Sequence, residues 1–338
     1  AGLVKLMRKA VVRLLLPREF ATVSPMNNTP HILVTGGAGY LGAILVPTLL
    51  ARGYRVTVVD NFMYGQTSLL DCCAHEHFTV IRGDVRDERL MLPLLKKADV
   101  IMPLACLVGA PLCAQKPIEA RSINLDAILM LLEHASPAQR FISPTSNSGY
   151  GIGQEGVYCT EETPMTPVSL YGQLQVELEK RLLDAGAVSL RLATVCGISP
   201  RMRLDLLVND FTYRAVTDRF VVLFEAHFKR NYIHVRDVAR AFLHSLDNFD
   251  AMRGQPYNVG LSDANLSKME LCLEIKKQAP DFTIMEAPIG KDPDQRNYIV
   301  SNAKIEATGY QPQVSIQRAI AELIRGYQII RRNQHANV

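Results

Sequence analysis

The sequence predicts an α/β protein built around a doubly wound parallel sheet, and three observations support this fold class. Short apolar runs rich in β-branched residues alternate with helical stretches of about 10 to 15 residues. A glycine-rich turn joins the first apolar run to the first helical stretch. The second apolar run ends in an acidic residue about 20 positions beyond that turn. Sheets of this kind bind ligands at the carboxyl ends of their strands, so the site is expected at that edge.

Length and composition limit the possible classes of protein. The chain has 338 residues, of which 48% are hydrophobic and 21% are charged, and this mixture excludes a disordered protein. At this length about two lobes are expected. The 37 basic and 33 acidic residues nearly balance, so nucleic acid is not an expected partner. No apolar run approaches the roughly 20 residues of a membrane span, and no membrane partner is predicted.

The seven cysteines include the adjacent pair Cys72 and Cys73 but show no Cys-x-x-Cys spacing. Neither a zinc site nor a disulfide framework is therefore predicted, and no metal is expected. Reduced, mostly buried thiols are the simplest interpretation. They favour a cytoplasmic location.

Residues 1–28 form a basic extension ahead of the first predicted strand. Their basic residues lie among apolar ones and are Lys5, Arg8, Lys9, Arg13 and Arg18. Such a segment is either a targeting or membrane-surface helix or an extension that the fold does not need. We favour the second interpretation and exclude the segment from the predicted fold.

His31–Thr35 is the first predicted strand, and a glycine-rich turn at 36–42 joins it to a helical stretch at 43–52. Glycines allow a dinucleotide pyrophosphate to approach backbone amides at the helix N-terminus, where partial positive charge is concentrated and a Cβ would obstruct it. The residues of this turn predicted to bind the cofactor are Gly36, Gly39, Tyr40, Leu41 and Gly42.

The second predicted strand, Arg55–Val59, leads directly to Asp60. An acidic side chain at this place binds the adenosine ribose hydroxyls and repels a 2′-phosphate. Asn61 follows rather than a basic residue, and we expect it to contact the cofactor too. The predicted cofactor is therefore NAD rather than NADP.

Further strands are predicted at 78–81, 99–102, 140–143 and 191–195, and the run 316–330 is a predicted amphipathic helix. Small and polar residues follow two of these strands, at the edge where a parallel sheet binds ligand. Those expected to contact the cofactor are Asp84, Val85, Leu104 and Ala105.

Residues 145–151 read Thr-Ser-Asn-Ser-Gly-Tyr-Gly, and residues 170–175 read Leu-Tyr-Gly-Gln-Leu-Gln. With the glycine turn and the segments 230–237 and 256–260, they resemble the extended short-chain dehydrogenase/reductase superfamily, in its NAD-dependent nucleotide-sugar epimerase and dehydratase branch. The resemblance runs from about residue 31 to about residue 330.

The resemblance implies a division into a Rossmann-type NAD-binding domain and a smaller C-terminal substrate-binding lobe. The NAD-binding domain would take 29–197 with a return segment at 234–260. The substrate lobe would take 198–233 and 261–330. A homodimer paired through a helix bundle is also implied.

Tyr171 and Ser146 match the family's catalytic tyrosine and its neighbouring hydroxyl. The tyrosine takes the proton of a sugar hydroxyl, so its pKa, near 10 in water, must be lowered for work near neutral pH. The family does this with a lysine four residues on, one helical turn away. This chain has Gln175 there, which can hydrogen-bond the nicotinamide ribose but carries no charge.

The resemblance places the diphosphate of a nucleotide sugar near Asn209 and Arg230. Arginine suits this role because its planar guanidinium pairs two phosphate oxygens. Lys291 stands where the family has an arginine, with Arg296 as its replacement, and Val108 is also expected to contact the substrate.

The implied activity is epimerisation of a nucleotide sugar through transient oxidation of one hydroxyl. A nucleotide-sugar dehydrogenase or reductase, and an NAD-binding protein impaired by Gln175, remain alternatives. Dehydration is disfavoured, because Asn147 and Ser148 stand where sugar 4,6-dehydratases carry an acidic pair. Neither the sugar nor the base follows from the sequence.

Overall fold

The protein is described by a computed structural model that covers residues 29–290 and 296–330. The basic extension 1–28 and Lys291 lie outside the described residues. The expectations for them therefore stay predictions.

Seven parallel strands form the central sheet, in the order β11-β7-β5-β4-β1-β2-β3. They are β1 (His31–Thr35), β2 (Arg55–Asp60), β3 (Phe78–Arg82), β4 (Val100–Pro103), β5 (Arg140–Ser146), β7 (Val188–Leu192) and β11 (Pro256–Val259). The chain runs outward from β1 to β2 and β3, then returns to β4 on the other side. This reversal confirms the doubly wound sheet and opens a crevice at the carboxyl ends of β1 and β4.

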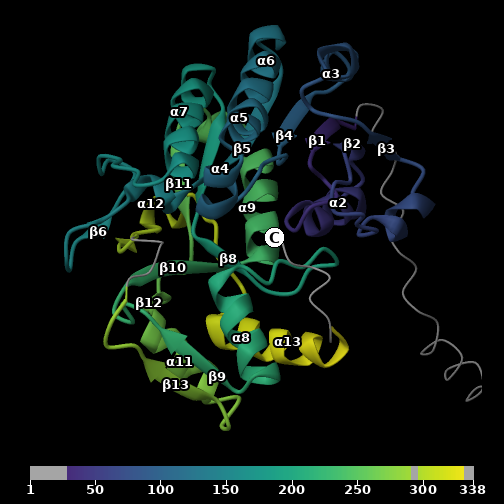
Figure 1. Ribbon diagram of the computed structural model, residues 1–338. Coiled ribbons are helices and arrows are strands. Elements are labelled where there is room, and N and C mark those ends of the chain that lie inside the picture. Colours follow the sequence, from purple (N-terminus) through teal and green to yellow (C-terminus); the bar gives the residue numbers. More distant parts are fainter. Residues whose placement is uncertain (1–28, 291–295, 331–338) are drawn as a thin grey trace, which may run out of the picture.

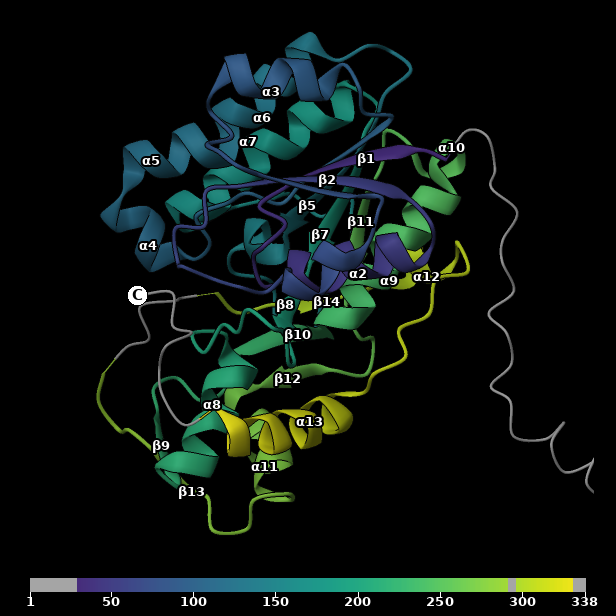
Figure 2. The ribbon, with the colours of Figure 1, turned by 90° about the vertical axis from the view of Figure 1, so that its right-hand side faces the viewer.

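Helices cover both faces of the sheet (Figures 1 and 2). On one face lie α2 (Gly42–Ala51) and α9 (Val235–Asp247), and on the other α3 (Glu88–Leu95), α6 (Ala127–His134) and α7 (Leu170–Asp184). The shorter helical elements are η1 (Leu70–Ala74), α4 (Ala110–Gln115), α5 (Pro117–Arg121), η2 (Ser122–Asp126), η3 (Asn147–Tyr150), α10 (Phe249–Met252) and α12 (Ala303–Glu306).

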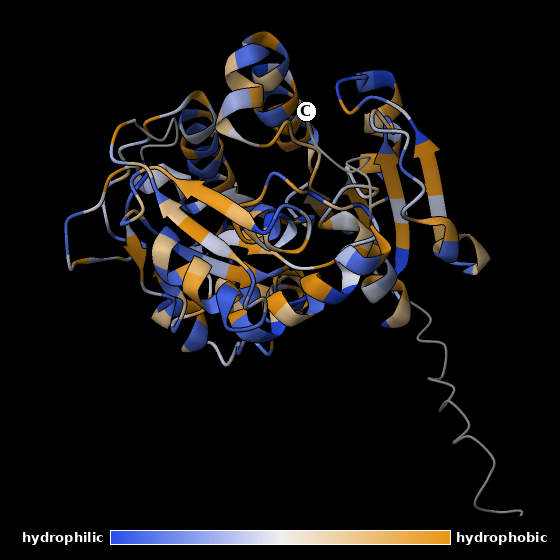
Figure 3. Ribbon diagram, turned by 60° about the horizontal axis from the view of Figure 1, so that its bottom comes forward, coloured by the Kyte–Doolittle hydropathy of each residue, from blue (hydrophilic) through white to orange (hydrophobic). Residues whose placement is uncertain are grey.

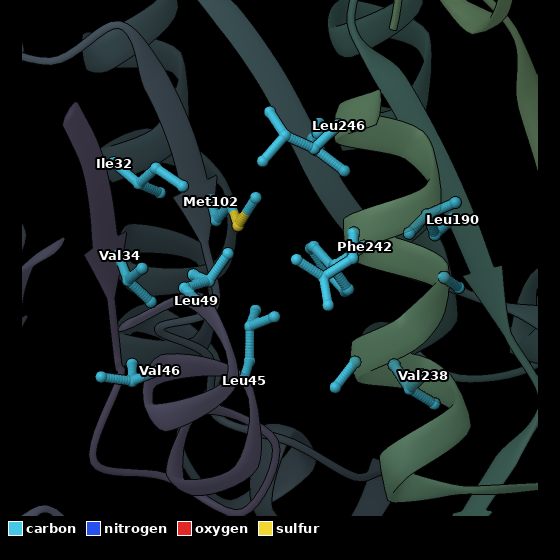
Figure 4. Packing of buried hydrophobic residues seen from close by; sticks show 14 of the residues in the cluster. Ile32, Val34, Leu45, Val46, Leu49, Met102, Leu190, Val238, Phe242 and Leu246 are labelled. Atoms are coloured by element: carbon cyan, nitrogen blue, oxygen red, sulfur yellow. The ribbon is translucent and has the colours of Figure 1, made fainter. Parts of the chain in front are cut away.

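Successive residues of β1 enter different cores. Ile32 and Val34 pack with Leu49 of α2 and Phe242 of α9 (Figure 4), whereas Leu33 belongs to the cluster on the other face. Side chains alternate across a strand, so a sheet covered on both faces needs an apolar residue at every position. This accounts for the largely apolar strands, and Figure 3 shows strands with orange apolar stretches interrupted by more polar positions.

The predicted strand at 191–195 is wrong as a single element. β7 ends at Leu192, and β8 (Thr194–Cys196) begins after Ala193. β7 pairs with β5, whereas β8 pairs with β10 (Lys229–His234), which also pairs with β12 (Asn265–Ser267) in a three-stranded sheet. An apolar run shows that a segment is buried but not which strand pairs with it, so the change of partner was not visible in the sequence.

A second group of elements packs beyond the carboxyl ends of the strands (Figure 2). It contains α8 (Leu207–Thr217), β9 (Phe220–Leu223), α11 (Lys268–Lys276), β13 (Thr283–Glu286) and α13 (Ile316–Ile329), and their apolar residues form a separate cluster. Two short strands, β6 (Tyr158–Cys159) and β14 (Ile299–Val300), pair nearby. The predicted terminal helix is confirmed as α13. Among the described residues, no helix combines the length and the apolar character that crossing a membrane requires.

A buried polar network fixes α7 against the sheet. The guanidinium of Arg191 on β7 donates to both carboxylate oxygens of Glu179 on α7, at 2.7 to 3.1 Å. Ser189 of β7 donates to the same carboxylate at 2.8 Å, and Thr145 of β5 lies 3.1 Å from it. Arg191 also donates to the hydroxyl of Tyr150 at 2.9 Å. One carboxylate therefore joins the helix to two neighbouring strands.

Replacing Glu179 by Ala should destabilise the protein by about 3–5 kcal/mol, because it leaves a buried guanidinium without its counter-charge. Glu177→Ala on the same helix is the matched control. Its ion pair with Arg121, at 3.3 Å, is about half exposed and should contribute less than about 1 kcal/mol. Urea unfolding of both variants tests this, and equal losses of stability would contradict it.

Candidate active site

A cavity of about 1000 Å³ lies at the carboxyl ends of the central strands, between the two groups of elements. Its walls come from the glycine turn, the ends of β2, β4 and β5, the start of α7, and the segments after β8. The residues singled out from the sequence that line it are Gly36, Gly39, Tyr40, Leu41, Gly42, Asp60, Asn61, Asp84, Val85, Leu104, Ala105, Val108, Ser146, Tyr171, Gln175, Arg230 and Arg296.

Two glycines of the turn lie too close to their neighbours to carry a side chain. A Cβ on Gly36 would stand 2.6 Å from the backbone N and Cα of Ala105, at the end of β4. Gly36 also has φ +67°, a conformation that costs other residues energy. A Cβ on Gly42 would stand 2.3 Å from the carbonyl oxygen of Gly37. The first turn of α2 thus presents bare backbone to the cavity.

Asp60 is held against the middle of this turn. Its carboxylate accepts the N–H of Ala38 at 3.0 Å and the N–H of Phe62 at 2.8 Å. Burial raises the pKa of Asp60, while the hydrogen bonds from Phe62 and Ala38 lower it. A bare helix N-terminus with a fixed acidic side chain beside it fits the pyrophosphate and ribose of NAD, the cofactor predicted from the sequence. Among the described residues, no group of three or more potential metal ligands occurs.

Asp84 also lines the cavity, and its carboxylate is hydrogen-bonded by Arg86. Arg86 donates to its carboxylate through Nε at 2.9 Å and through a second guanidinium nitrogen at 2.5 Å. The hydrogen bonds from Arg86 lower the pKa of Asp84. The carboxylate is therefore ionised near neutral pH and already oriented.

Tyr171 and Ser146 reach the cavity from adjacent elements. Tyr171 is the second residue of α7, whose first turn is capped by Ser169 accepting the N–H of Gly172 at 3.2 Å. Ser146 ends β5, and its oxygen accepts the N–H of Ser148 at 3.1 Å. The hydroxyl proton of Ser146 is thus available to another acceptor, and the nearby Ser146 hydroxyl lowers the pKa of Tyr171.

The phenol of Tyr171 is in an environment that favours its neutral form. Burial raises its pKa well above the ordinary value, and the nearby thiol of Cys106 raises it further. The charge of Arg203, the hydrogen bond with Ser146 and the charge of Arg296 act in the opposite direction. The phenol is consequently protonated near neutral pH unless more positive charge reaches it.

Gln175 lies one helical turn beyond Tyr171 and is 5% exposed. Its amide nitrogen lies 4.0 Å from the sulfur of Cys106 and donates a weak hydrogen bond to it. An amide supplies no charge to the phenol. The position that carries lysine in the related family therefore offers hydrogen-bonding capacity alone.

Asn209, expected at the substrate, does not line the cavity. Its side-chain oxygen accepts the N–H of Gly197 at 3.0 Å, and its nitrogen donates to the carbonyl of Arg203 at 2.9 Å and to the hydroxyl of Tyr40 at 3.3 Å. The amide is fully buried and satisfied within the protein. Asn209 thus joins Gly197, Arg203 and Tyr40, and its contact with a substrate stays a prediction.

Several lining residues were not among the candidates from the sequence, notably Arg201, Arg203 and Lys268. The two arginines follow β8 closely, and their spacing alone did not show which way they face. Lys268 opens α11 and donates to the carbonyl of Phe224 at 2.8 Å. Cationic side chains are consequently more numerous on this wall than the sequence indicated.

The fold and the cavity define a dinucleotide-binding α/β protein with a phenol and an alcohol at the ligand-facing edge of its sheet. Comparison with protein families shows to which family of such proteins the chain belongs. The chain belongs to the NAD dependent epimerase/dehydratase family, whose model matches residues 32–260. The family is NAD dependent, and NAD is also the cofactor that the glycine turn and Asp60 fit.

Individual relatives are distant. UDP-glucose 4-epimerase of Lactobacillus helveticus is 30% identical over 296 residues, covering 78% of this chain and 86% of its own length. UDP-glucuronic acid decarboxylase 1 of Arabidopsis thaliana is 26% identical over 312 residues, covering 88% of this chain and 69% of its own length. The crystal structure of Thermus thermophilus UDP-glucose 4-epimerase with NAD matches with a TM-score of 0.76 at 25% identity, over 88% of this chain and 99% of that one.

Replacing Gly36 by Ala should weaken NAD binding by about tenfold or more, which corresponds to about 1.4 kcal/mol. The added Cβ forces the turn away from β4 and displaces the backbone amides at the helix N-terminus. Gly53→Ala is the control, because Gly53 has φ +84° but no atom within 4 Å of an added Cβ. Calorimetric titration of both variants with NAD checks this, and an unchanged affinity in the Gly36 variant would disprove the assigned cradle.

Proposed function

We propose that this protein is an NAD-dependent nucleotide-sugar epimerase that works by transient oxidation of a sugar hydroxyl. The observation that carries the proposal is one cavity in which Tyr171 and Ser146 share a wall with the glycine turn. Its substrate side carries Arg230, Lys268 and Arg296. The residues for redox chemistry and those for an anionic substrate thus line a single space.

The proposed chemistry assigns one role to each hydroxyl. The oxygen of Tyr171 accepts the proton of the sugar hydroxyl, and the hydroxyl of Ser146 donates a hydrogen bond to the same sugar oxygen. Bound NAD supplies the hydride acceptor, the hydride donor for the return step, and a positive charge in its oxidised form. In the return step Tyr171 gives the proton back to the sugar oxygen. Rotation of the oxidised sugar between the two steps inverts the carbon.

The proposed substrate is a nucleoside diphosphate sugar, because the substrate side of the cavity is cationic. Arg230 is 4% exposed, and Lys268 is 3% exposed. Arg230 also lies 5.7 Å from the ring centre of Tyr298, which limits the directions its guanidinium can take. A planar guanidinium held in this way suits two phosphate oxygens. UDP-sugars are the natural first probes, because the relatives named above act on them.

The proposal also assigns the two ligands to different parts of the chain. Residues 29–197 and 234–260 are proposed to bind NAD, and residues 198–233 and 261–330 to bind the sugar nucleotide. A homodimer paired through a bundle that contains α7 stays a prediction.

Gln175 keeps one alternative open, an NAD-binding protein with impaired catalysis. A dehydrogenase or reductase of a nucleotide sugar is the second. Incubation with UDP-hexoses and UDP-glucuronic acid separates the three. An isomer indicates an epimerase, stoichiometric reduced nicotinamide indicates a dehydrogenase, and neither product from any GDP-, dTDP- or UDP-sugar would refute the proposal.

Replacing Tyr171 by Phe should lower the epimerisation rate by about 100-fold or more, because the sugar proton loses its acceptor. Ser146→Ala should have a smaller effect in the same direction. NAD should stay bound in both variants. Tyr158→Phe, an exposed tyrosine outside the cavity, is the control. A Tyr171 variant that turns over as fast as the Tyr158 variant would refute the assigned base.

A further inference from the structure

The proposed mechanism requires a source of positive charge at Tyr171. Its phenol is partly buried at the wall of the cavity, and the usual lysine position on the same helix carries the neutral Gln175. A phenol in such a site acts as a base only if a cation stabilises its ionised form. Another residue of the cavity therefore has to supply part of that charge.

Arg203 is a candidate source of this positive charge because of where it lies. It lines the same cavity as Tyr171 and is 9% exposed. Its guanidinium donates to both oxygens of Asp205, at 3.1 and 2.5 Å. The side chain of Asp205 is 29% exposed against 11% for that of Arg203, so the cation is the more deeply placed member of the pair.

The backbone of Arg203 is fixed as firmly as its side chain. Its carbonyl accepts the side-chain amide of Asn209 at 2.9 Å. Asn209 also bonds Gly197 and Tyr40, and the hydroxyl of Tyr40 donates to the carbonyl of Gly197 at 2.6 Å. Tyr40 belongs to the glycine turn. This buried cluster therefore ties the loop that carries Arg203 to the cofactor side of the cavity.

The charge of Arg203 acts on three groups around one place. It lowers the pKa of Tyr171, of Tyr40 and of the Cys106 thiol, against the larger effect of burial in each case. The other titratable groups that act on Tyr171 are Cys106, from the segment after β4, and Arg296, whose effect is smaller than that of Arg203.

We propose that Arg203 takes over part of the role of the lysine missing at position 175, supplying from the substrate side of the cavity a share of the positive charge that stabilises the ionised form of Tyr171. Arg203 does not take the proton itself. It acts through Tyr171, by stabilising the ionised phenol, and is therefore a positioning residue. The expected effect on the reaction rate rests on the proposed function. The expected effect on the pKa of Tyr171 does not, because it is measurable without a sugar substrate.

The first readout is the tyrosinate titration of Tyr171 in NAD-loaded protein. It is isolated as the ultraviolet difference between each variant and the same variant carrying Tyr171→Phe. Arg203→Met should raise the pKa of Tyr171 by about one unit or more, and Arg203→Lys should raise it less. Arg214→Met is the matched control, because Arg214 is held by Asp210 at 2.9 and 3.0 Å but lies outside the cavity.

Arg203→Met leaves Asp205 without its partner, and this alone could disturb folding or the local field. Arg203→Met/Asp205→Asn removes both charges together. An upward shift is still expected in that double variant, smaller than in Arg203→Met because no unpaired carboxylate adds to it. A Tyr171 titration unchanged from the Arg214 control in either variant would overturn the inference.

The second readout is the pH profile of turnover, with position 175 restored to lysine. A base works when deprotonated, so the rate rises with pH through the pKa of Tyr171. Arg203→Met should move that rise to higher pH and lower the rate below it about tenfold per unit. Adding Gln175→Lys to that variant should reverse most of the loss.

Gln175→Lys in the otherwise unchanged chain tests the inference without altering Arg203. It should raise the rate less than about tenfold, because the site already holds a cation. A gain of about tenfold or more would show that the charge is missing and would overturn the inference. If no nucleotide sugar is converted but Arg203→Met still raises the pKa of Tyr171, the proposed function fails and the inference stands.

Discussion

The arrangement of the site depends on the buried ion pair between Glu179 and Arg191. It joins α7 to β7, and Thr145 extends the network to β5. Tyr171 lies about two helical turns before Glu179, and Ser146 directly follows Thr145. The phenol and the alcohol are therefore positioned by the same network. Apolar packing alone tolerates small displacements of a helix along a sheet, whereas directional hydrogen bonds to charged groups favour one register.

Both groups of elements contribute residues to the walls of the cavity. The central sheet and the helices packed on it supply the bare backbone of the glycine turn, the carboxylate of Asp60, and the hydroxyls of Ser146 and Tyr171. The elements beyond β8 supply most of the positive charge. Tyr40 connects the two sides, since its hydroxyl bonds Gly197 and Asn209 while its carbonyl accepts the hydroxyl of Ser199 at 2.7 Å. A residue of the glycine turn thus also connects the two groups of elements.

A charge can be moved within a family without loss of its effect, because a Coulomb field depends on distance and surroundings and not on position in the chain. A lysine on the tyrosine's own helix and an arginine from another segment are equivalent solutions if both reach the phenol. The neutral residue at position 175 is then a relocation of charge instead of a defect. This also explains why a single departure from a motif is weak evidence of lost activity until the rest of the cavity is known.

The sequence by itself determined the parallel sheet, the glycine turn, the acidic end of β2 and the placement of Ser146 at a strand end and Tyr171 at a helix start. Each of these depends on neighbours a few residues away, so local patterns carry them. Only the tertiary structure decided that the run 191–195 divides between two sheets, that Asn209 turns inward, and that Arg203 and Lys268 face the cavity. Those outcomes depend on contacts between segments far apart in the chain, and composition and spacing hold no record of such contacts.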